Sequence, residues 1–257
     1  MFDMPETTKK SVDVEAVLFT HVPALQRYPF LLRRLLIWGL EAIVNEDRIN
    51  RFLQDNDYLR DFDFIERVFD ELKIDYLVQP DEIRNIPATG RVLIVANHPL
   101  GGLDGLALLR LIGALRHDVL IVVNELLMNI KPLKGLFLPV DVFGQDTKKP
   151  SLSQIIDALN DEKAVIIFPS GEVSRVGAKG VRDRKWLSGF LRIAEKTSAP
   201  ILPIHIRARN SMLFYLVSRL SQTLSMLMLP REMTGFKGKI NFKIGQSIVL
   251  NDIEKVP

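Results

Sequence analysis

Short, unbroken apolar runs alternate with longer segments of helical periodicity through the central part of the chain. The apolar runs predict buried strands at residues 91–97, 119–124, 136–143, 164–169 and 201–206. Between them, apolar residues recur at helical spacing near 105–116, 151–162 and 186–197. Strands that alternate with helices of this length are typical of βαβ units. The pattern therefore predicts an α/β fold in which helices flank a mostly parallel sheet.

Segments outside this central part complete the predicted architecture. Residues 237–245 alternate between polar and apolar, which predicts a half-exposed strand near a sheet edge, and residues 75–78 fit a short edge strand. Residues 212–229 are strongly apolar, but Arg219 and several hydroxyl and amide side chains interrupt them. Because a membrane span needs about 20 apolar residues, this segment predicts a buried or interfacial helix instead.

An apolar helix is predicted at residues 29–44, near the N-terminus. Arg33 and Arg34 lie together in it, and Trp38 follows one turn later. An apolar body with paired arginines and a tryptophan is typical of a helix that lies in the plane of a membrane surface. The alternative is an ordinary packed helix whose arginines extend to solvent.

The chain is expected to divide into two regions. One or two amphipathic helices with acidic outer faces follow at residues 45–75, and a connector rich in turn residues leads to the first buried strand. We therefore expect residues 1–89 to form an N-terminal helical, membrane-interfacial region. Residues 90–257 are expected to form the α/β domain.

Composition and charge exclude several kinds of chemistry. The 257 residues include no cysteine, so disulfides and thiolate catalysis are excluded. The formal net charge of +3 is too small to indicate a nucleic-acid partner. Residues 175–185 nevertheless concentrate basic side chains around Asp183. Such a segment suits a phosphate, an acidic carrier protein or an anionic membrane surface, and a solvated loop is the alternative.

The most informative stretch is RVLIVANHPLGGLDG, residues 91–105. The strand ends at Asn97 and His98, a double-glycine turn follows, and Asp104 stands at the expected start of a helix. An aspartate that accepts from one imidazole nitrogen leaves the other free to take a proton from a hydroxyl. The alternative is a histidine that ends a strand and an aspartate that caps a helix.

Unusual residues follow other predicted strands as well. FPSGEVSR, residues 168–175, places Glu172 and Arg175 after the strand at 164–167. Asp141 lies within FLPVDVFG, and RARNS follows the strand at 201–206. Taken singly, each of these also fits a turn, an ion pair or a helix cap.

Four stretches in this order resemble the blocks of the glycerolipid (lysophospholipid) acyltransferase superfamily: NHPLGGLDG, GLFLPVD, FPSGEVSR and APILPIHIRARNS. They cover about residues 90–211, roughly half of the chain. The resemblance implies that His98 is a general base oriented by Asp104. It also implies that Gly171, Glu172 and Arg175 bind the acceptor. The same blocks contain further candidate substrate-binding residues: Asn97, Gly101, Gly102, Asp141 and Pro169. The resemblance implies no metal and no cofactor.

The blocks depart from the family pattern in three respects. Five residues separate His98 from Asp104 where the family has four, and Leu103 occupies the usual position of the acid. Asp104 is therefore expected to take over, with the double glycine absorbing the extra residue. The second block has Asp141 where an arginine normally binds the acceptor phosphate. In the third block Glu172 follows the glycine.

These departures resemble the hemolysin-like branch of the superfamily, which includes lyso-ornithine lipid O-acyltransferases. The resemblance implies transfer of a fatty acyl chain from acyl-carrier protein or acyl-CoA to the hydroxyl of a lyso-lipid such as lyso-ornithine lipid. The charge of the basic segment at 175–185 predicts that Arg182, Arg184 and Lys185 bind the acidic donor. The implied location is peripheral, at the cytoplasmic face of the inner membrane. A phosphatidate-forming 1-acylglycerol-3-phosphate acyltransferase and a non-catalytic membrane-binding protein are the alternatives.

Overall fold

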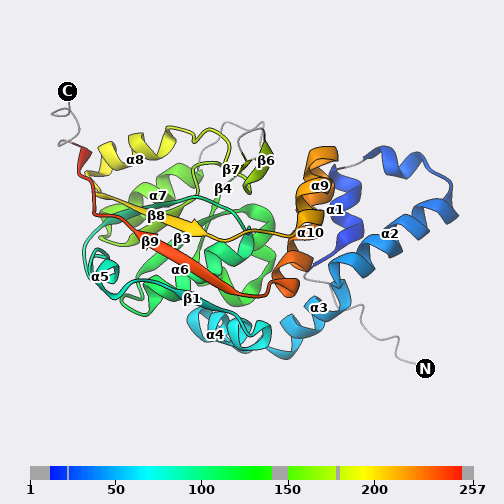
Figure 1. Cartoon of the computed structure of the whole chain (residues 1–257), viewed down its shortest axis with the longest axis horizontal. Coiled ribbons are helices and arrows are strands. Elements are labelled where there is room, and N and C mark those ends of the chain that lie inside the picture. Colours follow the sequence, from blue (N-terminus) through cyan, green and yellow to red (C-terminus); the bar gives the residue numbers. More distant parts are fainter. Residues whose placement is uncertain (1–11, 22, 141–149, 178–179, 251–257) are drawn as a thin grey trace.

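Strand β2 (Val92–Ala96) lies in the middle of the sheet, and all of its residues are buried. A computed structural model describes residues 12–21, 23–140, 150–177 and 180–250 (Figure 1). Over these residues the main sheet has seven strands in the order β1-β9-β8-β2-β5-β3-β4. Its other strands are β1 (Asp75–Leu77), β3 (Val119–Asn124), β4 (Phe137–Val140), β5 (Ala164–Ile167), β8 (Ile201–Arg207) and β9 (Lys239–Ile244).

The sheet is mostly parallel, as the sequence predicts. Strand β2 pairs in parallel with β5 and β8, and β3 pairs in parallel with β5 and β4. Strand β9 runs antiparallel to β8, and β1 pairs with β9 at the edge. Burial on both faces explains why β2 reads as an unbroken apolar run, whereas β9 alternates between buried and exposed residues.

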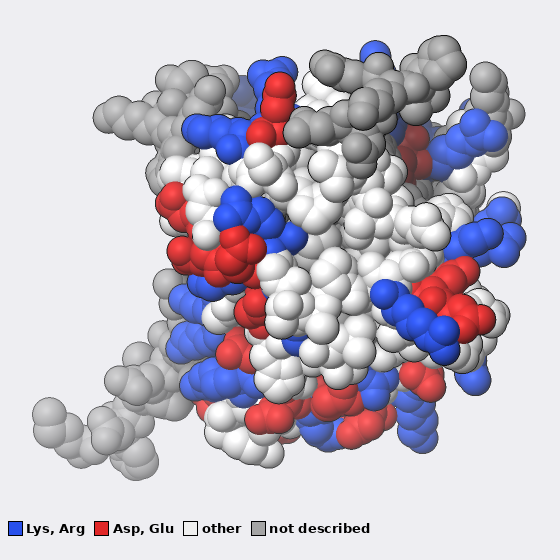
Figure 2. Space-filling model, turned by 90° about the vertical axis from the view of Figure 1, so that its left-hand side faces the viewer, with Lys and Arg blue, Asp and Glu red and all other residues white. Residues whose placement is uncertain are grey.

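Helices cover both faces of the sheet. Ile94 and Ala96 of β2 face a core shared with α4 (Asp61–Leu72) and α6 (Gly102–Gly113). Leu93 and Val95 face a second core shared with α7 (Pro150–Asn160) and α8 (Gly189–Thr197). Figure 2 shows the side of the molecule where α5 (Pro80–Ile83) and α8 lie, with acidic and basic side chains interspersed around an uncharged area.

The N-terminal helices are partly built into the same core. Buried residues of α4 join the core beside β2, together with Leu53 of α3 (Glu46–Asp55). Strand β1 then extends the sheet beyond β9. The expected boundary at residues 89–90 therefore falls between elements that share one sheet and one core.

Helices α1 (Val14–His21), α2 (Phe30–Val44), α9 (Met212–Leu220) and α10 (Gln222–Gly235) gather at one end of the molecule, toward which β8 points (Figure 1). The single helix expected at 212–229 is two helices. Ser221 is extended where they meet, and its side chain accepts from the N–H of Leu224 as the cap of α10. Within the described part of the chain, every helix is too short or too polar to cross a bilayer.

Candidate active site

The strand β2 continues directly into a tight turn that leads to α6. Gly101 has a φ of 81°, a conformation that side-chain-bearing residues rarely adopt. A Cβ atom placed there would lie 3.0 Å from Cδ2 of Leu229, which packs over the turn from α10. Gly102, the first residue of α6, is exposed and has open space around its Cα. Only Gly101 of the pair is therefore required by the geometry.

This turn brings His98 and Asp104 together. Nδ1 of His98 lies 3.2 Å from Oδ2 of Asp104. Leu103, which occupies the spacing usual for the family's acid, points into the hydrophobic core instead. The extra residue is thus accommodated at Gly101, and Asp104 reaches the imidazole.

The pair is in contact but not in an aligned hydrogen bond. Within the described residues neither Nδ1 of His98 nor Oδ1 of Asp104 has a hydrogen-bond partner. Catalytic hydrogen bonds are often poorly aligned without substrate and tighten in the complex. A hydrogen bond from Nδ1–H to Oδ2 would leave Nε2 as the free acceptor nitrogen of the ring.

Asp104 is fully buried, and this governs its electrostatics. Its Oδ2 accepts from the N–H groups of Leu100 at 2.7 Å and Gly101 at 3.1 Å. Burial raises the pKa of the Asp104 carboxyl above its ordinary value, while His98 and these two N–H groups lower it part of the way back. The carboxylate is therefore held at the start of α6 by a few specific donors in place of water.

Other segments hold the backbone on the other side of the turn. The N–H of Ser174 donates to the carbonyl oxygen of His98 at 2.8 Å. Nδ2 of Asn210 donates to the carbonyl oxygen of Pro99 at 3.0 Å, and both oxygens of Asp183 accept from the N–H of His98. The third and fourth sequence blocks thus meet at the turn by holding its main chain.

Asn97 extends the pairing of β2 with β8 beyond the end of the strand. Its Nδ2 donates to the carbonyl oxygen of Ile206 at 2.9 Å, and its Oδ1 accepts from the N–H of the same residue at 2.7 Å. The side-chain amide is therefore occupied by backbone. Its contact with substrate stays a prediction, and the structure adds a positioning role.

The FPSGEVSR turn lies directly against the histidine. The ring of Phe168 stacks on the imidazole of His98, with centroids 4.0 Å apart and planes 21° from parallel. The N–H of Gly171 closes the turn onto the carbonyl oxygen of Phe168, and the carbonyl oxygen of Pro169 accepts from the N–H of Leu187. The imidazole is 17% exposed, so it remains open to a reactant on its uncovered side.

Glu172 and Arg175 face each other and connect this turn to helices α9 and α10. Oε2 of Glu172 accepts from Nε of Arg175 at 2.9 Å and from Nε2 of Gln222 at 3.0 Å. Arg175 also reaches the carbonyl oxygen of Ser218 on α9. The two charges predicted to bind the acceptor therefore neutralise each other in the absence of substrate.

The predicted donor-binding residues lie at the end of a small hairpin formed by β6 (Arg175–Gly177) and β7 (Gly180–Arg182) and directly after it. Arg182, Arg184 and Lys185 are all exposed. Arg184 is already paired, since its Nη1 lies 2.8 Å from Oε1 of Glu172. Asp141 lies outside the described residues. In the part of the chain that is described, no cluster of acidic and histidine side chains could hold a metal ion.

Sequence reasoning missed Asp183 and Phe168, both of which contact His98. Asp183 stood out only as the acid in a basic segment, and Phe168 was read as the start of a turn motif. A lone acid among bases next to a tryptophan is a weak signal, because its partners come from distant parts of the chain.

Replacing each glycine of the turn separately tests the backbone argument. Gly101→Ala is expected to lower the free energy of unfolding by about 1–3 kcal/mol, because it combines a strained φ with a close contact to Leu229. Gly102→Ala, its matched control, is expected to stay within about 0.5 kcal/mol of the parent. Urea unfolding measures both, and equal losses for the two variants would contradict the assignment.

The comparisons with known proteins agree on one family. A family model described as "Acyltransferase" matches residues 16–255. A lyso-glycine lipid O-acyltransferase of Phocaeicola vulgatus is 30% identical over 255 residues, which cover 95% of this chain and 88% of that protein. One of Bacteroides thetaiotaomicron is 32% identical over 217 residues, which cover 83% of this chain and 76% of that protein.

Among solved structures, the 1-acyl-sn-glycerophosphate acyltransferase PlsC of Thermotoga maritima aligns with a TM-score of 0.49 at 20% identity, over 91% of this chain and 80% of that one. The family match and the two curated relatives confirm the resemblance drawn from the four sequence blocks. The chain belongs to the acyltransferase family and is an enzyme that transfers acyl groups.

Proposed function

We propose that this enzyme transfers a fatty acyl chain from a thioester donor to the hydroxyl of a lyso-lipid whose head group carries an amino acid. The observation that carries the proposal is the contact between His98 and the buried Asp104 inside a turn held on several sides. The relatives support the acceptor class, because both are lyso-glycine lipid O-acyltransferases. Lyso-ornithine lipid, which the sequence blocks suggest, belongs to the same class.

The proposed reaction is direct transfer without an acyl-enzyme. Nε2 of His98 takes the proton of the acceptor hydroxyl as its oxygen attacks the thioester carbonyl, and the thiolate leaves as the tetrahedral intermediate collapses. Asp104 stabilises the imidazolium, which then protonates the leaving thiolate. The hydroxyl of Ser170 donates to the carbonyl oxygen of Glu172. Because this hydrogen bond lies within its own turn, Ser170 is not oriented as a nucleophile.

The charge balance beside His98 favours a head group with little net charge. Glu172 is 13% exposed and contacts both Arg175 and Arg184, so the cations nearest to it are already paired. A phosphate monoester would have to break these pairs and desolvate Glu172. A zwitterionic head group can exchange one partner for another at lower electrostatic expense.

Helices α2 and α9 expose large apolar side chains that could enter a membrane surface. Leu31, Leu35 and Trp38 of α2 are 81%, 61% and 65% exposed, and Met212 and Leu220 of α9 are each 82% exposed. Exposure of several large apolar side chains on neighbouring helices is typical of an interaction site. Leu229 of α10 also packs on the catalytic turn, and α10 contacts α2. We infer that this surface docks on the bilayer and brings the turn close to lipid.

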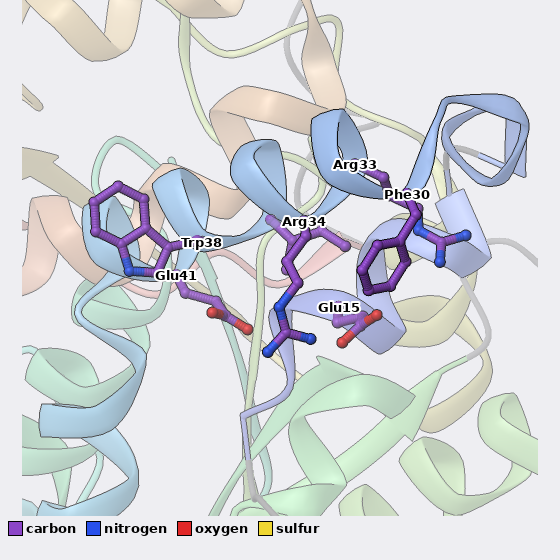
Figure 3. A pocket seen from close by; sticks show the side chains of 7 residues that line it. Glu15, Phe30, Arg33, Arg34, Trp38 and Glu41 are labelled. Atoms are coloured by element: carbon purple, nitrogen blue, oxygen red, sulfur yellow. The ribbon is translucent and has the colours of Figure 1, made fainter.

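Charged side chains lie next to the exposed apolar side chains of α2. A hollow of about 320 Å³ beside α1 and α2 is lined by both signs of charge. Figure 3 shows Arg34 extending between the carboxylates of Glu15 and Glu41, with Trp38 and Phe30 at either end. An amphipathic surface of this composition favours peripheral binding. Because thioester donors are cytoplasmic, we propose the cytoplasmic face of the inner membrane as its location.

An acyl-transfer assay tests the acceptor and the donor. The enzyme is incubated with lyso-glycine lipid, lyso-ornithine lipid or lysophosphatidate, each with acyl-CoA and with acyl-carrier protein, and products are identified by mass. We expect transfer to an aminolipid and at least about a tenfold lower kcat/KM with lysophosphatidate. A preference for lysophosphatidate would show a phosphatidate-forming enzyme, and no transfer in any combination would refute the proposed function.

Reversing Arg182 and Lys185 to Glu is expected to raise the KM of the donor only.

Variants of the pair test the proposed roles in the same assay. His98→Ala is expected to abolish transfer, and Asp104→Asn to lower kcat by about 10²–10⁴-fold, because the amide cannot stabilise an imidazolium. Since burial raises the pKa of Asp104, its ionisation opposes folding as the pH rises through that pKa. Asp104→Asn is therefore expected to be at least as stable as the parent at neutral pH in urea unfolding. A folded Asp104→Asn protein with normal turnover would contradict the role.

Membrane docking is tested by removing apolar side chains from α2. Leu31, Leu35 and Trp38 are replaced together by Ser, and binding to vesicles of mixed zwitterionic and anionic lipid is measured by sedimentation. The partition coefficient is expected to fall at least about tenfold, because three side chains no longer enter the interface. Tyr58→Ser and Leu77→Ser change exposed apolar residues elsewhere and serve as controls. Equal effects of both sets would refute this docking face.

A further inference from the structure

Asp183 makes contacts that the reaction proposed above does not use. Its Oδ1 and Oδ2 lie 3.2 and 3.3 Å from the backbone nitrogen of His98, which donates to both. Oδ1 also accepts from the hydroxyl of Ser174, and Oδ2 accepts from Nε1 of Trp186 at 3.0 Å. One carboxylate therefore gathers three donors from two other segments and its own loop.

These contacts complete the hold on the main chain of His98. Its carbonyl oxygen accepts from the N–H of Ser174 at 2.8 Å, and its N–H donates to Asp183. Ser174 thus touches His98 directly and also orients the carboxylate that binds it. Both backbone groups of the histidine are fixed by residues 174–186, while Asp104, at the start of α6, contacts its ring.

A carboxylate is the group that this position requires. An acceptor with two oxygens satisfies the N–H of His98, the hydroxyl of Ser174 and the indole N–H together, and charge strengthens each of these bonds. An asparagine in its place offers one oxygen and turns an NH₂ group toward one of the remaining donors. The position therefore discriminates between two side chains of nearly the same size.

We propose that Asp183 is a positioning residue for acyl transfer, which holds the backbone of His98 so that the imidazole keeps its contact with Asp104 and its stack on Phe168. This inference rests on the proposed function. It differs from the donor-binding role of Arg182 and Arg184, which flank Asp183 and are exposed. Asp183 would affect the rate through the position of His98 alone, because a misplacement of about 1 Å in a catalytic group can lower a rate on the order of 100-fold.

The backbone N–H of His98 gives a readout that is independent of activity. The chain has four histidines, so ¹⁵N-histidine labelling gives a short amide spectrum in which His98→Ala identifies the His98 signal. Asp183→Asn is expected to move the His98 amide proton upfield and to speed its hydrogen exchange at least tenfold, because a charged acceptor is lost. Asp81→Asn, an exposed carboxylate on α5, is the matched control and leaves the signal in place. An unmoved signal in Asp183→Asn would overturn the proposal.

Steady-state kinetics separates positioning from donor binding. Asp183→Asn is expected to lower kcat by about 10–100-fold with the KM values of donor and acceptor within twofold of the parent. A raised donor KM with unchanged kcat would make Asp183 part of the donor site and overturn the proposal. Asp81→Asn is expected to match the parent in both constants.

Ser174→Ala covers the case in which Asp183→Asn fails to fold. It keeps the carboxylate and removes one of the groups that orient it, so we expect a smaller shift of the His98 amide and a two- to tenfold loss of kcat. If this variant moves neither, the proposal is overturned. An inactive parent would refute the proposed function alone, since the amide measurements would still report whether Asp183 holds His98.

Discussion

The buried carboxylate of Asp104 stabilises the turn that joins β2 to α6. Asp104 accepts from two consecutive N–H groups of the turn and lies in contact with the imidazole, so the same group closes the backbone and orients the ring. Because burial raises the pKa of this carboxyl, the N–H groups of Leu100 and Gly101 and the side chain of His98 are the groups that lower it again. The support of the turn and the contact with the imidazole therefore depend on the same buried residue.

The rest of the site is arranged around this turn by elements that arrive from far away in the sequence. The loop with Asp183 fixes His98, Asn210 fixes Pro99, and Leu229 closes over Gly101. The Glu172–Arg175 pair then ties the neighbouring turn to α9 and α10. Direct contacts therefore connect the helices with the most exposed apolar side chains to the segments that surround His98.

The pattern of apolar residues predicted the positions of the strands and the fold class, because these features depend on neighbouring residues in the sequence. Unbroken apolar runs gave the buried strands, and the order of strands and helices gave a mostly parallel sheet. The break at Ser221 was not foreseen, because the apolar residues of α9 and α10 read as one continuous segment. Likewise, the sequence gives no sign of the contacts that Asp183 makes with His98 and Ser174, because the tertiary fold brings these two donors to it. Contacts between distant segments leave no periodicity to read.

The left-handed bend at Gly101 has a consequence for recognising related enzymes. With five residues between His98 and Asp104, this bend still brings the carboxylate into contact with the imidazole. A search pattern with the shorter spacing would select Leu103, a core side chain, and discard the chain. A pattern written for this loop should therefore allow five intervening residues and require a glycine at the third position before the acid, where the backbone has a positive φ.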